Sequence, residues 1–202
     1  MDRHFFDSTL IYLNGPPSVG KDTIGLALHH DFHCTIHRFK EQLITLVLEV
    51  YNVSRAEFLE LYKNKESSTP LLGGRSPRQA LIHMSEEVIK PAFGDAYFGQ
   101  ATARSIDLED IKEGGIVMTD CGFATEVNEV VKAYPDRKHI LVRLGRAGCN
   151  FKLDSRSYIK DNEFLGNHTL DVHCLNNPTI AAGQVLTAIN ELRMGTRNAE
   201  TY

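Results

Sequence analysis

Residues 15–23 read Gly-Pro-Pro-Ser-Val-Gly-Lys-Asp-Thr and follow an apolar run at residues 10–13, which predicts a β-strand ending at Asn14. The two glycines allow the backbone to turn tightly, so that several N–H groups can approach one phosphate without a Cβ in the way. Lys21 would reach the outer phosphates of a nucleotide. A helix beginning near Asp22 or Thr23 would place its positive end at the same anion. The stretch therefore predicts a phosphate-binding loop.

The loop departs at one position from the pattern Gly-x-x-x-x-Gly-Lys-Ser/Thr. Asp22 stands where a magnesium-binding hydroxyl is usual, and the hydroxyl is displaced to Thr23. A carboxylate can bind Mg²⁺ directly or through water, so both residues are candidate metal ligands. The residues expected to bind ATP are Gly15, Ser18, Val19, Gly20, Lys21, Asp22 and Thr23.

Length and composition limit which classes of protein this chain can belong to. A length of 202 residues with 42% hydrophobic and 24% charged residues predicts a single domain over residues 1–202. The net charge of −4 does not favour wholesale binding of nucleic acid. The four cysteines form no C-x-x-C pair, which speaks against a zinc site and a disulfide framework. No apolar stretch of about 18 residues exists and the N-terminus has no signal-peptide layout, so we expect a cytoplasmic protein without membrane contact.

Expected strands and helices alternate along the chain, which predicts an α/β fold with a mostly parallel central sheet and helices on both faces. The expected strands lie at residues 10–13, 35–37, 116–120, 139–144 and 171–174. Helices with both ends predicted lie at about residues 23–30, 41–51, 76–90, 125–132 and 179–194. Two more helices are predicted by their starts alone, one at the capping box of Ser54 and Glu57 and one at Asp95. Residues 52–75 are expected to form a mobile segment on the substrate side, because they contain a run rich in Gly, Pro and Ser.

Two further features point to chemistry at the sheet edge. Asp120 ends an apolar strand at its carboxyl end, where ligands of parallel sheets gather, and it is a candidate magnesium or substrate contact; the alternative is an ordinary helix-capping aspartate. Four basic residues follow the next strand, interleaved with glycines: Arg143, Arg146, Lys152 and Arg156. Arginines on a glycine-containing segment are typical of a small lid that closes over phosphates, which we expect at residues 145–167. The alternative is a solvated charged loop.

Four stretches together resemble the phage deoxynucleoside monophosphate kinase family, a branch of the P-loop nucleoside monophosphate kinase fold. They are Gly20-Lys21-Asp22-Thr23, the helix start Ser76-Pro77-Arg78-Gln79-Ala80-Leu81 with Glu87 and Lys90, residues 119–126 (similar to the family's Asp-x-Arg-Phe-x-x-Glu), and residues 146–156 in the lid position. The resemblance spans most of the chain. Gly122 departs from it, because the family has arginine there. Arg78, Lys90 and Arg104 are candidates to supply the missing cation.

The resemblance implies transfer of the γ-phosphoryl group of ATP, with Mg²⁺, to a (deoxy)nucleoside monophosphate as small-molecule partner, in the host cytoplasm if the protein is phage-encoded. It implies catalytic roles for Lys21, Asp120, Arg146 and Arg156, and magnesium binding by Asp22, Thr23 and Asp120. Arg78 and Lys90 would hold the acceptor's phosphate, and Tyr97 would contact its base. The resemblance also allows a homodimer.

Two other functions stay open. A kinase of the same fold could act on another acceptor, such as a hydroxyl group of modified DNA or a small phosphorylated metabolite. A non-catalytic module could bind ATP without passing its phosphate to any small acceptor. The arginines of the expected lid and of the helix at Arg78 favour the nucleotide kinase, because a binding module needs no second anion pocket.

Overall fold

The sheet has five parallel strands in the order β2-β3-β1-β4-β5. It is seen in a computed structural model that describes residues 8–107, 111, 114–152, 154, 156–175, 177–193 and 195. The strands are β1 (Thr9–Asn14), β2 (Thr35–His37), β3 (Ile116–Cys121), β4 (Lys138–Gly145) and β5 (His168–His173). The predicted α/β class with a parallel sheet is confirmed.

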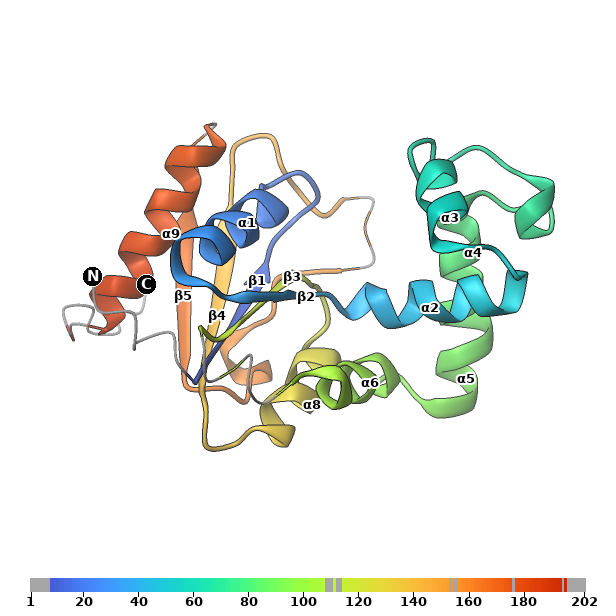
Figure 1. Ribbon diagram of the computed structural model, residues 1–202. Coiled ribbons are helices and arrows are strands. Elements are labelled where there is room, and N and C mark those ends of the chain that lie inside the picture. The colour runs from blue at the N-terminus through green and yellow to red at the C-terminus, as the bar shows by residue number, and fades with distance from the viewer. Residues whose placement is uncertain are drawn as a thin grey trace.

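Helices cover both faces of this sheet (Figure 1). The helices α1 (Lys21–Phe32) and α9 (Pro178–Arg193) share one buried cluster with Ile11 and Leu13 of β1. The helices α6 (Tyr97–Ser105) and α8 (Ala124–Ala133) share the other cluster with Leu10 and Tyr12. Successive residues of a strand point to opposite faces of the sheet. Because helices cover both faces, every residue of β1 is buried.

A third group of helices projects from the sheet on the right of Figure 1. It consists of α2 (Phe39–Tyr51), α3 (Arg55–Tyr62), α4 (Pro77–Ile82), η3 (His83–Ile89) and α5 (Lys90–Phe93). These helices enclose a buried cluster of their own around Val47, Phe58 and Leu72. The capping box of Ser54 and Glu57 is confirmed, and Gln79 completes a second one with Ser76. The helix predicted to end near Lys90 continues to Phe93, and its middle part, η3, is π-helical.

The two segments predicted to move contain ordered structure. The segment at residues 52–75 includes α3 and the short helix η2 (Pro70–Leu72), and both Phe58 and Leu72 are fully buried. Residues 146–167, which we call the strap, join β4 to β5 and contain the short helix η4 (Asp161–Glu163). Ile159 and Phe164 anchor the strap in the cluster under α6 and α8. Movement of either segment stays a prediction.

The last strand begins earlier than predicted, at His168 instead of Asp171. The strand β5 lies at the edge of the sheet, so Leu170 and Val172 point inward while Asp171 and His173 stay exposed. The sequence signal for the first residues of β5 is weak, because polar residues alternate with apolar ones along this strand. No helix in the described part of the chain is long and apolar enough to cross a membrane.

Candidate active site

The loop between β1 and α1 has the shape of an anion cradle. Gly20 at the N-cap of α1 has φ 111°, a value that favours glycine. A Cβ on Gly15 would lie 2.7 Å from the carbonyl oxygen of Leu144 in β4, so the loop packs too closely against the sheet for a side chain. Both positions thus require glycine, as the sequence predicts, and phosphate binding by the loop's backbone N–H groups stays a prediction.

Lys21 folds back over this loop. Its Nζ donates hydrogen bonds to the carbonyl oxygens of Gly15 at 2.6 Å and Pro16 at 2.8 Å. Burial, together with the positive charge of Arg156, lowers the pKa of Lys21 to about 8. The amine is therefore held where negative charge would stabilise its protonated form.

ATP binding at pH 8 is therefore expected to take up about half a proton, because triphosphate oxygens restore the pKa of Lys21 toward its ordinary value. At pH 6, where Lys21 is already protonated, the uptake should be much smaller. Calorimetry in two buffers of different ionisation enthalpy measures it.

The control for this uptake is Lys21→Arg, whose guanidinium keeps its charge at both pH values. It is needed because burial and the charge of Asp120 also raise the pKa of Glu126 to about 8. An unchanged uptake in the arginine variant would mean that Lys21 is not its source.

The two carboxylates predicted to bind magnesium lie at the end of β3. Asp22 accepts hydrogen bonds from Thr119 Oγ1 at 3.3 Å and from Arg38 Nη2 at 3.4 Å. Asp120 accepts them from the backbone N–H groups of Phe39 at 2.9 Å and Lys40 at 3.0 Å, so it caps α2, which precedes it in sequence. Burial raises the pKa of Asp120. Thr23 is exposed in the first turn of α1.

No cluster of three or more His, Cys, Asp or Glu residues able to hold a metal is found in the described part of the chain. A magnesium ion bound with nucleotide takes many of its ligands from phosphate and water, so one or two carboxylates at this edge fit it. Magnesium binding by Asp22, Thr23 and Asp120 stays a prediction.

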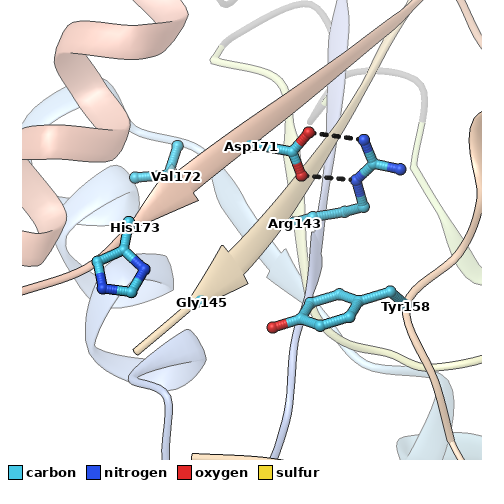
Figure 2. A pocket seen from close by; sticks show the side chains of 6 residues that line it. All are labelled: Arg143, Gly145, Tyr158, Asp171, Val172 and His173. Atoms are coloured by element: carbon cyan, nitrogen blue, oxygen red, sulfur yellow. Dashed lines mark hydrogen bonds and ion pairs between the residues drawn. The ribbon is translucent and has the colours of Figure 1, made fainter. Parts of the chain in front are cut away.

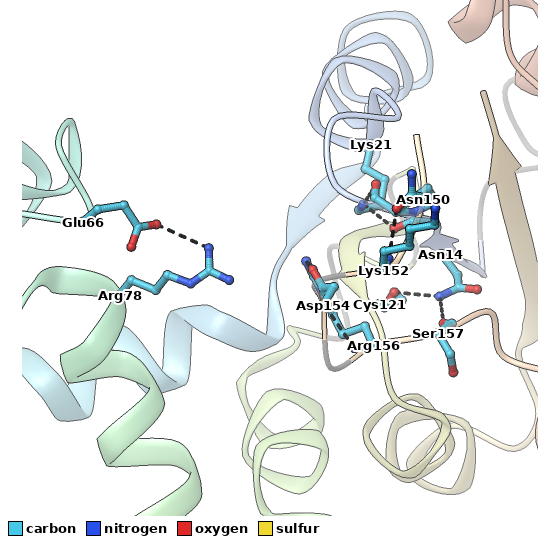
Figure 3. A network of polar contacts seen from close by, with 12 residues as sticks. Asn14, Lys21, Glu66, Arg78, Cys121, Asn150, Lys152, Asp154, Arg156 and Ser157 are labelled. Carbon is cyan, nitrogen blue, oxygen red and sulfur yellow. Dashed lines mark hydrogen bonds and ion pairs between the residues drawn. The ribbon is translucent and has the colours of Figure 1, made fainter. Parts of the chain in front are cut away.

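A cleft of about 890 Å³ opens beside the loop. One wall consists of Pro17 and Ser18 with part of the strap, and the other comes from the projecting helices. Its lining is Pro17, Ser18, Tyr62, Lys65, Arg78, Gly148, Cys149, Asn150, Lys152, Asp154 and Arg156. Figure 3 shows Arg78 on the opposite side from Asp154 and Arg156, with Lys21 above them in this view. Cations thus lie on both walls.

The strap's basic residues take separate positions. Arg156 Nε and Nη2 donate to the two carboxylate oxygens of Asp154 at 2.7 and 2.6 Å. Arg146 donates to the carbonyl oxygen of Ser18, which ties the strap to the loop. Arg143 does not belong to this group: it pairs with Asp171 at a second cavity on the open edge of the sheet, shown in Figure 2.

Lys90 and Tyr97 do not line the cleft. Lys90 bonds Glu86 at 2.6 Å and lies over the ring of Phe123, 4.8 Å from its centroid. Tyr97 packs against Phe93 and Phe98. A contact of either residue with an acceptor stays a prediction that the cleft's lining does not support.

Sequence reasoning missed two residues here. Lys65 lies in a polar loop with no motif around it, yet it lines the cleft beside Arg78. Asn14 is fully buried, and its amide donates to the carbonyl oxygens of Cys121 and Ser157 while its Oδ1 accepts from the N–H of Ile159. It joins β1, β3 and the strap. The sequence indicated this role of Asn14 only by placing a polar residue at the end of an apolar strand.

We compared the sequence and the structure of this chain with those of known proteins. No protein-family model and no curated protein matches the sequence. Among solved structures, a sugar kinase from Janibacter sp. HTCC2649 matches with a TM-score of 0.51 at 10% identity, over 91% of this chain and 95% of that one. The chain has the fold of a P-loop kinase.

Two other kinases resemble this P-loop kinase fold less closely. A gluconokinase from Sinorhizobium meliloti 1021 has a TM-score of 0.49 at 10% identity, covering 94% of this chain and 96% of that one. Shikimate kinase from Aquifex aeolicus has 0.43 at 14% identity, covering 92% and 99%. Identities this low concern the fold alone.

Proposed function

We propose that the protein transfers the γ-phosphoryl group of ATP to a phosphorylated acceptor, a (deoxy)nucleoside monophosphate. The observation that supports this is the presence of cations on both walls of one cleft. Lys152 and Arg156 lie on the side of the phosphate-binding loop, where the donor's phosphates would bind. Lys65 and Arg78 lie on the opposite wall, and a second group of cations there is useful when the acceptor is also an anion.

On the donor side, the backbone N–H groups of residues 16–21 would cradle the phosphates, and Lys21 would turn from the carbonyl oxygens of Gly15 and Pro16 toward them. Asp22, Thr23 and Asp120 are the residues that would hold magnesium. Bound magnesium would supply neutralisation of phosphate charge.

On the strap side, Arg146 is already hydrogen-bonded to the loop, and Arg156 is already near enough to Lys21 for the two positive charges to interact. Cations fixed before the reaction stabilise the developing charge without reorganising. An acceptor phosphate is ionised at neutral pH, so the residues here need only position it and need not remove a proton.

A hydroxyl acceptor is the second candidate, and the buried carboxyl of Glu126 favours it. Glu126 is 7% exposed, and burial together with Asp120 raises its pKa to about 8. A carboxylate with such a pKa is suited to accept a hydroxyl proton near neutral pH. Under this alternative the acceptor needs no phosphate.

The test is ADP release with ATP and Mg²⁺ against a panel of deoxynucleoside monophosphates, their nucleosides and simple sugars. Turnover is expected only with monophosphates. Arg78→Ala should raise KM for the acceptor about 10- to 100-fold, the effect of losing charge-assisted hydrogen bonds, and leave KM for ATP nearly unchanged. Arg55→Ala is the matched control, because Arg55 belongs to the same helical group but pairs with Glu41 outside the cleft lining.

Each other outcome names a different function. Turnover with unphosphorylated hydroxyl compounds, unaffected by Arg78→Ala, would favour the second candidate. ATP binding without phosphoryl transfer to any compound would favour the non-catalytic module.

A further inference from the structure

Gly122 leaves a space that another residue fills. It follows β3 directly, and a Cβ built on it would lie 2.2 Å from Cδ and 2.4 Å from Cγ of Arg156. Gly122 is not among the glycines with positive φ, so its backbone conformation does not demand glycine. What demands glycine is room, because the stem of Arg156 lies across this position.

Asp154 holds the other end of the same side chain. Its carboxylate accepts from Nε and Nη2 of Arg156, and also from the backbone N–H of Arg156 at 3.0 Å. These hydrogen bonds lower the pKa of Asp154 to about 2, so the pair stays charged over the working range of pH. The pair uses Nε and Nη2 and does not involve Nη1, which points to Nη1 as the donor that would meet an incoming phosphate.

Arg156 lies inside the candidate site. It lines the cleft together with Pro17 and Ser18 of the phosphate-binding loop. Its stem lies on Gly122, which directly follows β3. The side chain therefore connects the cleft with the end of β3.

We propose that Gly122 is a positioning residue: the space above it forms a seat that aims Arg156 from the strap at the phosphate being transferred. That a phosphate is transferred at this place rests on the proposed function, whereas the packing of Arg156 on Gly122 does not. Arg156, rather than Arg78, Lys90 or Arg104, then supplies the cation expected at the end of β3.

The seat can be tested without any activity by urea unfolding of Gly122→Ala, Arg156→Ala and the double variant. Gly122→Ala should lower the unfolding midpoint in the wild-type background, since the new methyl group would lie 2.2 Å from Cδ and 2.4 Å from Cγ of Arg156. In the Arg156→Ala background the same substitution should lower the midpoint much less, because truncation at residue 156 leaves only a Cβ, at 3.0 Å.

Gly183→Ala is the control for the substitution itself, because a Cβ at Gly183 meets nothing within 4 Å. It should leave the unfolding midpoint unchanged or raise it slightly. A Gly122→Ala protein with the wild-type midpoint would overturn the seat. So would equal losses caused by Gly122→Ala with and without Arg156.

Turnover supplies an independent arm. Gly122→Ala should lower kcat about 10-fold or more in the wild-type background and have little effect in the Arg156→Ala background. Equal losses of kcat in both backgrounds would contradict the seat. If the wild type phosphorylates no monophosphate while the unfolding cycle behaves as expected, the seat stands and the proposed function fails.

Discussion

Replacing Lys21 by alanine is expected to lower kcat for ADP formation about a hundred- to a thousandfold at saturating ATP, the range found for losing one preorganised donor at developing charge. The amine is partly buried at the loop, where it donates to the carbonyl oxygens of Gly15 and Pro16. Its loss removes the cation nearest the loop's backbone. Initial rates of ADP release with the best acceptor measure the effect.

Lys63→Ala is the control for this experiment, because Lys63 is exposed and pairs with Glu60 away from the cleft lining. Its kcat should equal that of the wild type. If Lys21→Ala keeps more than about a tenth of wild-type kcat, the loop does not stabilise the transferring group as proposed here.

Replacing Gly99 by alanine is expected to lower the free energy of unfolding by about 1–3 kcal/mol, the range for overpacking a close contact. Gly99 lies in α6, where the helix meets α8 so closely that an added Cβ would lie 2.4 Å from the carbonyl oxygen of Glu126 and 2.7 Å from its Cα. Backbone atoms cannot turn aside as a side-chain end can, so the helices must separate. Urea unfolding measures the loss as a lower midpoint at an unchanged slope.

Gly183→Ala serves as the matched helix substitution. It lies in α9 with open space around it, so alanine should leave stability unchanged or raise it by up to about 1 kcal/mol. Equal stability of the two variants would mean that α6 and α8 do not meet at Gly99.

Local sequence patterns predicted the elements whose signals lie within a few residues. The strand β1 was predicted from a continuous apolar run, and the glycines of the loop from their backbone freedom. The capping box of Ser54 and Glu57 depends on a spacing of three residues. The parallel sheet followed from the order of such elements. Less was predictable for β5, whose edge position leaves one face polar, and for η3, whose π-helical hydrogen bonds follow from no local residue pattern.

At the candidate site, residue type and order along the chain predicted Lys21, Arg78 and Arg156, because a phosphate site needs cations near the carboxyl ends of parallel strands. Of these, Arg78 and Arg156 line the cleft. Residue type and order do not distinguish them from Lys90 and Arg143, which pair with Glu86 and Asp171 outside the cleft lining. The capping of α2 by Asp120, the cleft position of Lys65 and the space that Gly122 leaves for Arg156 each join segments distant in sequence. Such contacts depend on where packing brings the backbone, and no local pattern carries that information.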